Sequence, residues 1–293
     1  MTREISSIAA GLALARAPRP IPAGERIHVV GIAGAGASAA ALLACRAGAD
    51  VTGCDPGGAS QYTEPLLEAG IAIDWRHDPA HVTSTPHPDR LAVTKALTAV
   101  DPDHPELAVA RAIGVPVETW QQVVADTACG RRLVGIAGTH GKSTSSGWLV
   151  HVLTAAGADP CAFVGALMPA TVTGGLPATS RWGSGDAFVV EADEYAGNFD
   201  SYRPAVIVLT SAEWDHPDVF ADRAAVLATF ERWIRAAAEL WDAAERRPSE
   251  VDPPGAAETA PTGPPVLVAN VGDAGVAEIA ARLGDWPGRI VAQ

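Results

Sequence analysis

The sequence contains very little lysine and an excess of acidic residues. Only Lys95 and Lys142 occur among 293 residues, against nineteen arginines, and the formal net charge is −13. Such a charge argues against a general affinity for nucleic acid or for an anionic membrane surface. An anionic ligand would instead have to be bound by locally placed arginines and backbone N–H groups.

Cysteines and long apolar runs are also scarce. The chain has four cysteines, none in a C-x-x-C pair: Cys45, Cys54, Cys129 and Cys161. Their apolar surroundings are typical of reduced thiols in a cytoplasmic protein. No apolar run approaches the length of a membrane helix. Residues 8–15 imitate the core of a secretory signal, but Glu4 does not suit the basic start of one. We therefore predict a short surface helix that ends before Pro18, and a cytoplasmic protein without membrane insertion.

One of the two lysines lies in the most informative stretch of the chain. An apolar strand over residues 133–136 leads into Gly138-Thr-His-Gly-Lys-Ser-Thr144, and a helix is predicted over residues 142–156. Glycines allow the backbone to approach a phosphate, and the free N–H groups at the start of a helix point at it. Lys142 would meet the outer phosphates and Ser143 would bind Mg²⁺.

Ile136 occupies the place of the first glycine of the full phosphate-loop pattern, so an ordinary helix-capping turn remains the alternative. Lysine is scarce in this chain, yet one of its two lysines lies directly after the glycine of a strand–turn–helix pattern. This position favours the interpretation as a phosphate loop.

A second glycine loop lies near the start of the chain. The strand predicted over residues 26–30 runs into Gly31-Ile-Ala-Gly-Ala-Gly36, a helix over residues 37–47 follows, and the strand over residues 50–54 ends on Asp55. This is a βαβ pattern with an acidic residue about twenty positions after the loop, where a ribose hydroxyl could be bound. The glycine motif is weak alone, and a small-residue turn that packs a helix on a strand is the alternative.

Strand and helix patterns alternate along the rest of the chain, which predicts an α/β fold with parallel sheets covered by helices. We expect a lead-in over residues 1–24, a Rossmann-like domain over residues 25–129, and a second, phosphate-loop α/β domain over residues 130–293. Residues 165–185 are predicted to form a loop or an irregular hairpin, and the Pro/Ala/Gly-rich residues 247–265 a mobile loop. Further helices are expected over residues 64–69, 105–113, 120–128, 221–246 and 274–283, and further strands over residues 71–73, 91–94, 115–117, 161–164, 188–191, 205–209, 266–269 and 289–292.

Polar residues follow two apolar strands of the second domain. Glu191, Asp193 and Glu194 end one strand, and Glu213, Asp215 and His216 follow the other. Ligands of open α/β sheets bind beyond the carboxyl ends of strands. We therefore predict a magnesium site made by Ser143, Glu191 and His216, although His216 could equally cap a turn before Pro217. His140 is expected either to reach a phosphate or only to shape the loop.

Two other histidines, His77 and His81, flank Asp78-Pro79 in what looks like a helix-start turn. We assign them a structural role rather than metal binding, because no cysteine or second acid nearby in the sequence completes a ligand set.

These motifs, in this order, resemble the Mur ligases, the ATP-dependent amide-forming enzymes of peptidoglycan precursor synthesis. The resemblance covers about residues 26–293 and rests on Gly31-Ile-Ala-Gly-Ala-Gly36, Gly138-Thr-His-Gly-Lys-Ser-Thr144, Glu191-Ala-Asp-Glu-Tyr195, Arg203-Pro204 and Glu213-Trp-Asp-His-Pro-Asp218. Within the family the chain is most similar to the alanine-adding branch, whose members lack the lysine that some relatives carbamylate after the Asp-His motif.

The resemblance implies a role for each matching residue. ATP would be bound by Gly138, Thr139, His140, Gly141, Lys142, Ser143 and Thr144. Magnesium would be bound by Ser143, Glu191 and His216, and catalysis would rest on Lys142, Glu191 and His216. The sugar nucleotide UDP-N-acetylmuramate would be bound by Gly31, Ala33, Gly34, Ala35, Gly36, Asp55, Thr94 and Lys95. The family phosphorylates the muramyl carboxylate to an acyl phosphate, which the amine of L-alanine attacks; we expect a monomer or weak homodimer.

Several departures from the family pattern leave alternatives open. Ala33, Ala37 and Lys95 replace residues typical of the sugar-nucleotide site. The family's adenine-binding motif and its amino-acid-binding domain are not found, so we expect this chain alone to bind UDP-N-acetylmuramate without completing the amide. The alternatives are a ligase that recycles a muropeptide onto the same sugar nucleotide, a non-catalytic nucleotide- and sugar-nucleotide-binding protein, and an unrelated phosphate-loop ATPase.

Overall fold

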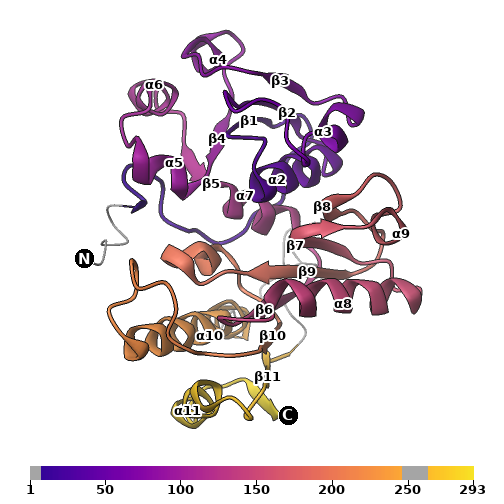
Figure 1. Ribbon diagram of the computed structural model, residues 1–293, viewed down its shortest axis with the longest axis vertical. Coiled ribbons are helices and arrows are strands. Elements are labelled where there is room, and N and C mark those ends of the chain that lie inside the picture. Colours follow the sequence, from indigo (N-terminus) through magenta and orange to yellow (C-terminus); the bar gives the residue numbers. More distant parts are fainter. Residues whose placement is uncertain (1–7, 246–262) are drawn as a thin grey trace. The chain divides into compact units, whose positions relative to one another are not determined.

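The computed structural model describes residues 8–245 and 263–293 of the chain (Figure 1). The described residues cluster into two compact units. The first unit runs to Thr127 and also includes Phe163–Trp182, and the second comprises Ala128–Ala162 and the chain from Gly183 onward. Among the described residues, no helix combines the length and apolarity that a membrane span requires.

The first unit is built on a five-stranded parallel sheet of order β3-β2-β1-β4-β5. Its strands are β1 (Arg26–Val30), β2 (Asp50–Cys54), β3 (Ala72–Asp74), β4 (Arg90–Val93) and β5 (Val117–Thr119). The connecting helices are α2 (Ala35–Arg46), α3 (Glu64–Glu68), α4 (Ala80–Thr83), α5 (Lys95–Val100), α6 (Pro105–Ile113) and α7 (Trp120–Thr127). These elements confirm the predicted Rossmann-like α/β pattern, in which apolar β1 and β4 are buried as central parallel strands should be.

Of the helix predicted to end before Pro18, residues 1–7 lie outside the described residues; Ile8 is helical, and a turn follows to Gly11. Residues 12–22 have no regular secondary structure. The Ala13 N–H donates to Val117 O at 2.8 Å, and the Arg16 side chain pairs with Glu118 and Asp126 at 2.7 Å each. These long-range bonds replace the helical ones, and the sequence pattern gave no sign of them.

A buried arginine joins three elements of the first unit. Arg90 of β4 is 1% exposed and contacts Glu118 of β5 at 2.8 Å, Asp126 of α7 at 2.5 Å and Glu25 at 3.2 Å. Burial of Asp126 alone would raise its pKa, but hydrogen bonds from Arg16, Arg90 and the Arg19 backbone hold the pKa below its ordinary value. The network therefore favours the charged form of the Asp126 carboxylate inside the fold.

The second unit contains the parallel strands β6 (Arg132–Ala137), β9 (Ala187–Ala192), β10 (Val206–Leu209), β11 (Val266–Ala269) and β12 (Arg289–Ala292). Within this unit the strand order is β12-β11-β10-β6-β9. Its helices are α8 (Lys142–Ala155), the 3₁₀ segment η1 (Tyr195–Ser201), α10 (Arg223–Glu245) and α11 (Ala274–Arg282). In this sheet β6 lies between β9 and β10, so the loop after β6 begins between the carboxyl ends of the two strands that carry the acidic motifs.

Two predictions need correction or lie outside the described residues. Of the two forms predicted for residues 165–185, the loop is wrong and the irregular hairpin agrees with the structure: β7 (Cys161–Met168) and β8 (Ala178–Arg181) are neighbouring strands, with the short helix α9 (Ala170–Thr173) between them in the chain. Side-chain bonds to backbone, such as Arg181 Nε to Val172 O at 2.8 Å, hold this Gly- and Thr-rich segment together. Most of the predicted Pro-rich loop over residues 247–265 lies outside the described residues.

Candidate functional site

The loop after β6 is compact because two glycines adopt backbone conformations that other residues avoid. Gly138 has φ +140° and Gly141 has φ +80°. A Cβ added at Gly138 would lie too close to Thr210 Oγ1 for any real contact, so only glycine fits between the loop and the end of β10. Thr210 Oγ1 donates to His140 O at 2.6 Å and fixes the turn.

Ser211, which follows β10, occupies two of the loop's backbone donors. The Thr139 N–H donates to Ser211 O at 3.1 Å, and the His140 N–H donates to Ser211 Oγ at 2.9 Å. The donors left for an anion are therefore the first N–H groups of α8, at Lys142, Ser143 and Thr144, which have no partner within the helix. The sequence gave no reason to expect a role for Thr210 or Ser211.

Lys142 begins α8 and turns back over the loop. Its Nζ donates to Gly138 O at 2.7 Å and to Glu194 Oε2 at 3.0 Å, and its side chain is only 13% exposed. A single cation is thus held, already oriented, above the helix N-terminus, as the phosphate interpretation requires. No finding tests its contact with a phosphate, which stays a prediction.

The predicted magnesium ligands are only partly brought together. Ser143 Oγ donates to Glu191 Oε1 at 2.8 Å, which joins the start of α8 to the end of β9. The side chains whose possible ligand atoms all lie within 4.8 Å of one another are Asp193, Glu194 and His216, a group that does not include Glu191. Glu194, which was not among the predicted ligands, therefore lies together with His216.

Glu194 is fully buried, and its Oε1 has no hydrogen-bond partner among the described residues. Burial raises the pKa of Glu194, although the charge of Lys142 opposes this. Its Oε1 lies 3.9 Å from His216 Nε2. An unpaired, buried carboxylate oxygen beside an imidazole and the Asp193 carboxylate has the chemistry that a divalent cation needs.

Two roles were predicted for His216, binding a metal and capping a turn. The first would involve its ring and the second involves its backbone. Its backbone has φ +54°, and its carbonyl accepts the N–H groups of Val219 and Phe220, both at 2.9 Å. Its ring faces Glu194 and lies edge-on to Tyr195, with centroids 5.1 Å apart. The turn-forming role is therefore present, and metal binding by the ring stays a prediction.

His140 likewise shapes the loop through its backbone, while its exposed ring lies 3.4 Å from the Glu213 carboxylate. A phosphate contact of this ring also stays a prediction.

The first glycine loop is fastened to the end of β2. The N–H groups of Gly31 and Ile32 donate to Cys54 O at 2.8 and 3.1 Å, and the Ala33 N–H donates to Asp55 Oδ2 at 3.0 Å. Asp55 Oδ1 accepts the Gly57 N–H at 2.9 Å. The structure thus places Asp55 against the loop, and its contact with a ribose is untested.

The helix after this loop begins at Ala35, with Gly34 as its N-cap. Gly36 has no room for a Cβ, which would overlap the ring of Trp120. Thr179 Oγ1 donates to Ala35 O at 2.8 Å and Ser60 Oγ to Ala33 O at 2.7 Å; the sequence indicated neither residue.

Thr94 and Lys95 lie at the start of α5. Thr94 is the N-cap of this helix and accepts the Ala96 N–H at 3.3 Å, and Lys95 follows as its first residue. The Thr94 methyl would lie 3.9 Å from a Cβ at Gly31, so this helix start and the glycine loop are neighbours.

Comparison with known proteins gives consistent matches. The model for "Mur ligase family, catalytic domain" matches residues 26–132. UDP-N-acetylmuramate--L-alanine ligase from Frankia casuarinae is 38% identical over 218 residues, and that from Clavibacter sepedonicus is 41% identical over 215 residues. These alignments cover 72% and 73% of this chain and 41% and 43% of the relatives, so the chain spans about two fifths of their length.

Solved structures agree with the fold. The crystal structure of UDP-N-acetylmuramate-alanine ligase from Thermotoga maritima matches with a TM-score of 0.65 and 26% identity, over 89% of this chain and 51% of that one. A UDP-N-acetylmuramate:L-alanyl-gamma-D-glutamyl-meso-diaminopimelate ligase from Neisseria meningitides matches with a TM-score of 0.70 over 92% of this chain and 78% of that one, but at 24% identity it supports the fold alone. On its motifs, its fold and these relatives, the chain belongs to the Mur ligase family.

Proposed function

We propose that the chain acts in the ATP-dependent joining of L-alanine to the muramyl carboxylate of UDP-N-acetylmuramate, through an acyl phosphate. The observation that carries this proposal is the position of Lys142, held at the N-terminus of α8 by Gly138 O and Glu194, beside the Ser143–Glu191 pair. Phosphoryl transfer depends mainly on positioning and on neutralising charge at the transferred group. This corner of the second unit offers a cation, helix N–H donors and carboxylates for a metal.

Each residue has a defined task in this reaction. The N–H groups of the first turn of α8 and the Lys142 ammonium would bind the ATP phosphates. When ATP binds, Lys142 would exchange its bond to the Gly138 carbonyl for a phosphate oxygen, while Glu194 continues to orient it. Ser143, Glu191 and His216 would hold Mg²⁺, which neutralises charge on the transferring phosphoryl group. Asp193 and Glu194 line the same position.

The relatives, rather than the ATP site, support the proposed substrate. Proteins named UDP-N-acetylmuramate--L-alanine ligase are 36–41% identical to this chain over about 72% of its length. The first glycine loop, with Asp55, Thr94 and Lys95 nearby, would bind the diphosphate and uridine of the sugar nucleotide. We place the reaction in the cytoplasm and expect a monomer or weak homodimer.

The proposal is tested by measuring ADP release from ATP and Mg²⁺ with and without UDP-N-acetylmuramate. We expect release to depend on the sugar nucleotide and to fall by about 10²–10³ in Lys142→Ala, since this is the usual cost of one preorganised charge donor. Val152→Ala, on an exposed position of the same helix, serves as the matched control and should leave the rate unchanged.

Two results would contradict the proposal and favour the alternatives. ADP release that ignores UDP-N-acetylmuramate would indicate an unrelated ATPase. Binding of both nucleotides without any ADP release, even with L-alanine present, would indicate a non-catalytic binding protein. Assaying UDP-N-acetylmuramoyl-alanine in the same samples also tests the expectation that this chain alone does not complete the amide.

A further inference from the structure

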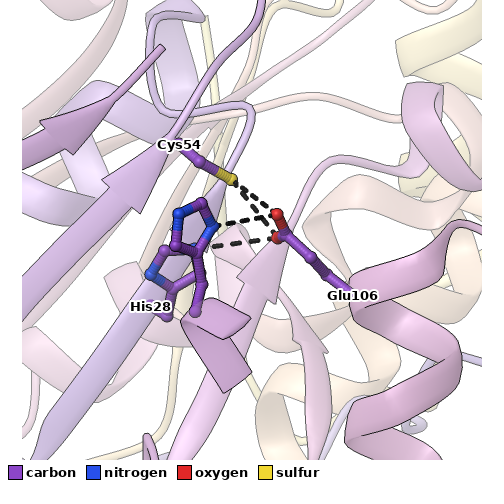
Figure 2. Close-up of side chains that lie close together, drawn as sticks. His28, Cys54 and Glu106 are labelled. Carbon is purple, nitrogen blue, oxygen red and sulfur yellow. Dashed lines mark hydrogen bonds and ion pairs between the residues drawn. The ribbon is translucent and has the colours of Figure 1, made fainter. Parts of the chain in front are cut away.

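The first unit contains a second group of possible metal-ligating side chains, none of which is assigned to the ATP site or to the predicted magnesium site. His28 of β1, Cys54 of β2, His81 of α4 and Glu106 of α6 bring their ligand atoms within 4.8 Å of one another. Figure 2 shows the ring of His28 and the thiol of Cys54 directed at the Glu106 carboxylate. His28, Cys54 and Glu106 are at most 3% exposed. Four ionisable groups therefore meet in the interior beside a core of aliphatic residues.

The spacing within this group suits a metal ion. Cys54 Sγ lies 3.3 Å from Glu106 Oε2, His28 Nε2 lies 3.7 Å from the same oxygen, and His81 Nδ1 lies 3.0 Å from Glu106 Oε1. In a tetrahedral zinc site, bonds of about 2.0–2.3 Å place neighbouring ligand atoms roughly 3.3–3.7 Å apart. Cys54 and His28 already lie at about these distances from one carboxylate oxygen of Glu106, and the ligand atoms of all four residues lie within 4.8 Å of one another.

The outer ring nitrogens of both histidines are held by oxygen atoms. His28 Nδ1 lies 2.8 Å from Thr52 Oγ1, which leaves Nε2 facing the group. His81 Nε2 lies 3.1 Å from Asp74 Oδ2, which leaves Nδ1 facing it. Histidines that bind metals characteristically have the second nitrogen fixed by an oxygen in this way.

One atom of the group is left without a partner. His28 Nε2 is buried and has no hydrogen-bond partner among the described residues, yet it points at the carboxylate and thiol. An unpaired buried polar atom costs about 1–3 kcal/mol, and a bound ion would remove this cost. Glu106 Oε1 accepts the Asp78 N–H at 2.7 Å, so Oε2 is the oxygen directed at both His28 and Cys54.

We propose that His28, Cys54, His81 and Glu106 form a closed structural site for a divalent transition ion of the zinc class. One thiolate, two imidazoles and one carboxylate make a ligand set that suits Zn²⁺ and disfavours Mg²⁺ or Ca²⁺. His77, whose Nδ1 lies 3.2 Å from Cys54 Sγ, would donate to the thiolate from outside the ligand set.

The ion would connect four elements beside the first glycine loop. The ligands come from β1, β2, α4 and α6, and Cys54 also accepts the Gly31 and Ile32 N–H groups through its carbonyl. A bound ion would therefore fix the end of β2, on which the first glycine loop is fastened. The sequence interpretation of His81 as purely structural was based on the lack of a nearby cysteine or second acid, and folding supplies both from distant positions.

Metal content and cobalt spectroscopy of the 293-residue chain test this site. We expect the purified protein to carry about one zinc ion per chain, and the chelator-treated protein to bind Co²⁺ with a thiolate-to-cobalt absorption band in the near ultraviolet. Both measurements are made in a His216→Gln background, so that the Asp193–Glu194–His216 group does not contribute. Chelation should also lower the unfolding temperature.

Matched variants separate this site from other cysteines. Cys54→Ser should abolish the thiolate band, whereas Cys45→Ser, the same change at a cysteine of α2 outside the group, should retain it. His81→Gln, at the most exposed ligand, should keep the band and weaken zinc affinity roughly tenfold or more. Circular dichroism of each variant reports whether it is folded.

Three results would overturn the proposal. The first is a folded chain that takes up no stoichiometric zinc in a chelator competition. The second is a thiolate band that persists in Cys54→Ser or disappears in Cys45→Ser. If Cys54→Ser does not fold, unchanged zinc affinity in His81→Gln is the third.

Discussion

Gly138 shows how little room the phosphate loop has. Its φ of +140° is rarely adopted by other residues, and Thr210 and Ser211 fill the space that a side chain would need. By contrast, Gly147, inside α8, has open space around the position of a Cβ and ordinary helical φ. Gly138 and Gly147, nine residues apart, should therefore respond in opposite ways to substitution by alanine.

Gly138→Ala should distort the loop and abolish ATP binding, because both the backbone angle and the neighbouring atoms oppose the new methyl group. Gly147→Ala should raise the free energy of unfolding by up to about 1 kcal/mol, since alanine is the better helix former. Urea unfolding and ATP titration of the two variants measure these effects. Wild-type ATP affinity in Gly138→Ala would refute the compact loop as the nucleotide site.

Residue patterns also set the limit of what the sequence could predict. The apolar strands and the lysine after the glycine were visible as local runs, and the structure places both as expected. Ser211, Thr179 and Glu194 were missed as contributors because each acts through contacts made only after folding. The His28–Glu106 group was missed because its members come from four separate elements.

At the scale of elements, the carboxyl end of β9 and the start of α8 meet through Glu191 and Ser143. Glu191→Gln and His216→Gln should each raise the Mg²⁺ concentration needed for nucleotide binding. Calorimetric titrations at several Mg²⁺ concentrations measure this shift, with Val152→Ala as control. An unchanged magnesium requirement in both variants would exclude these two residues as ligands.

The carboxylate–arginine network connects β4, β5 and α7, and it makes stability depend on pH. Hydrogen bonds from Arg16 and Arg90 hold the pKa of Asp126 below its ordinary value, so its contribution is fully present above about pH 4, the usual unfolded value. It should be lost as the pH falls through the lower folded value.

Urea unfolding of the protein and of Asp126→Asn should therefore show a large difference at pH 7 that shrinks below about pH 4. At pH 7 the variant should be destabilised by about 3–5 kcal/mol, since it leaves buried Arg90 short of a partner. Asp50→Asn, at an exposed position of β2, is the matched control. A difference that stays constant from pH 7 to pH 3 would contradict the assigned role of the charge.

At the scale of the whole molecule, the two units carry separate candidate sites. The first glycine loop belongs to the first unit, and the phosphate loop with its acidic group belongs to the second. The sequence located both loops but not the membership of Phe163–Trp182, which clusters with the first unit although it follows β6 and α8 in the chain. That membership depends on packing between residues far apart in sequence, such as Trp120 with Phe163.

Hydrogen exchange should show that each of the two glycine loops binds a different ligand. UDP-N-acetylmuramate should slow exchange around residues 31–36 and 55, and ATP with Mg²⁺ around residues 138–144. Each ligand at a hundred times its dissociation constant should add about 2.7 kcal/mol to the stability of the state that binds it. Protection of the first loop by ATP alone would contradict the assignment of the two loops.

If ATP activates the muramyl carboxylate, an oxygen atom of that carboxylate is transferred to phosphate, and isotope labelling follows this transfer. UDP-N-acetylmuramate labelled with ¹⁸O in the muramyl carboxylate is incubated with the chain, ATP, Mg²⁺ and L-alanine, and the released phosphate is analysed by mass spectrometry. If the carboxylate oxygen attacks the γ-phosphorus, and the amine of L-alanine or a water molecule then breaks the bond between the acyl carbon and this oxygen, each phosphate keeps one oxygen from the carboxylate. We predict ¹⁸O-labelled phosphate. Unlabelled phosphate, with its new oxygen drawn from water, would show that the carboxylate is not phosphorylated.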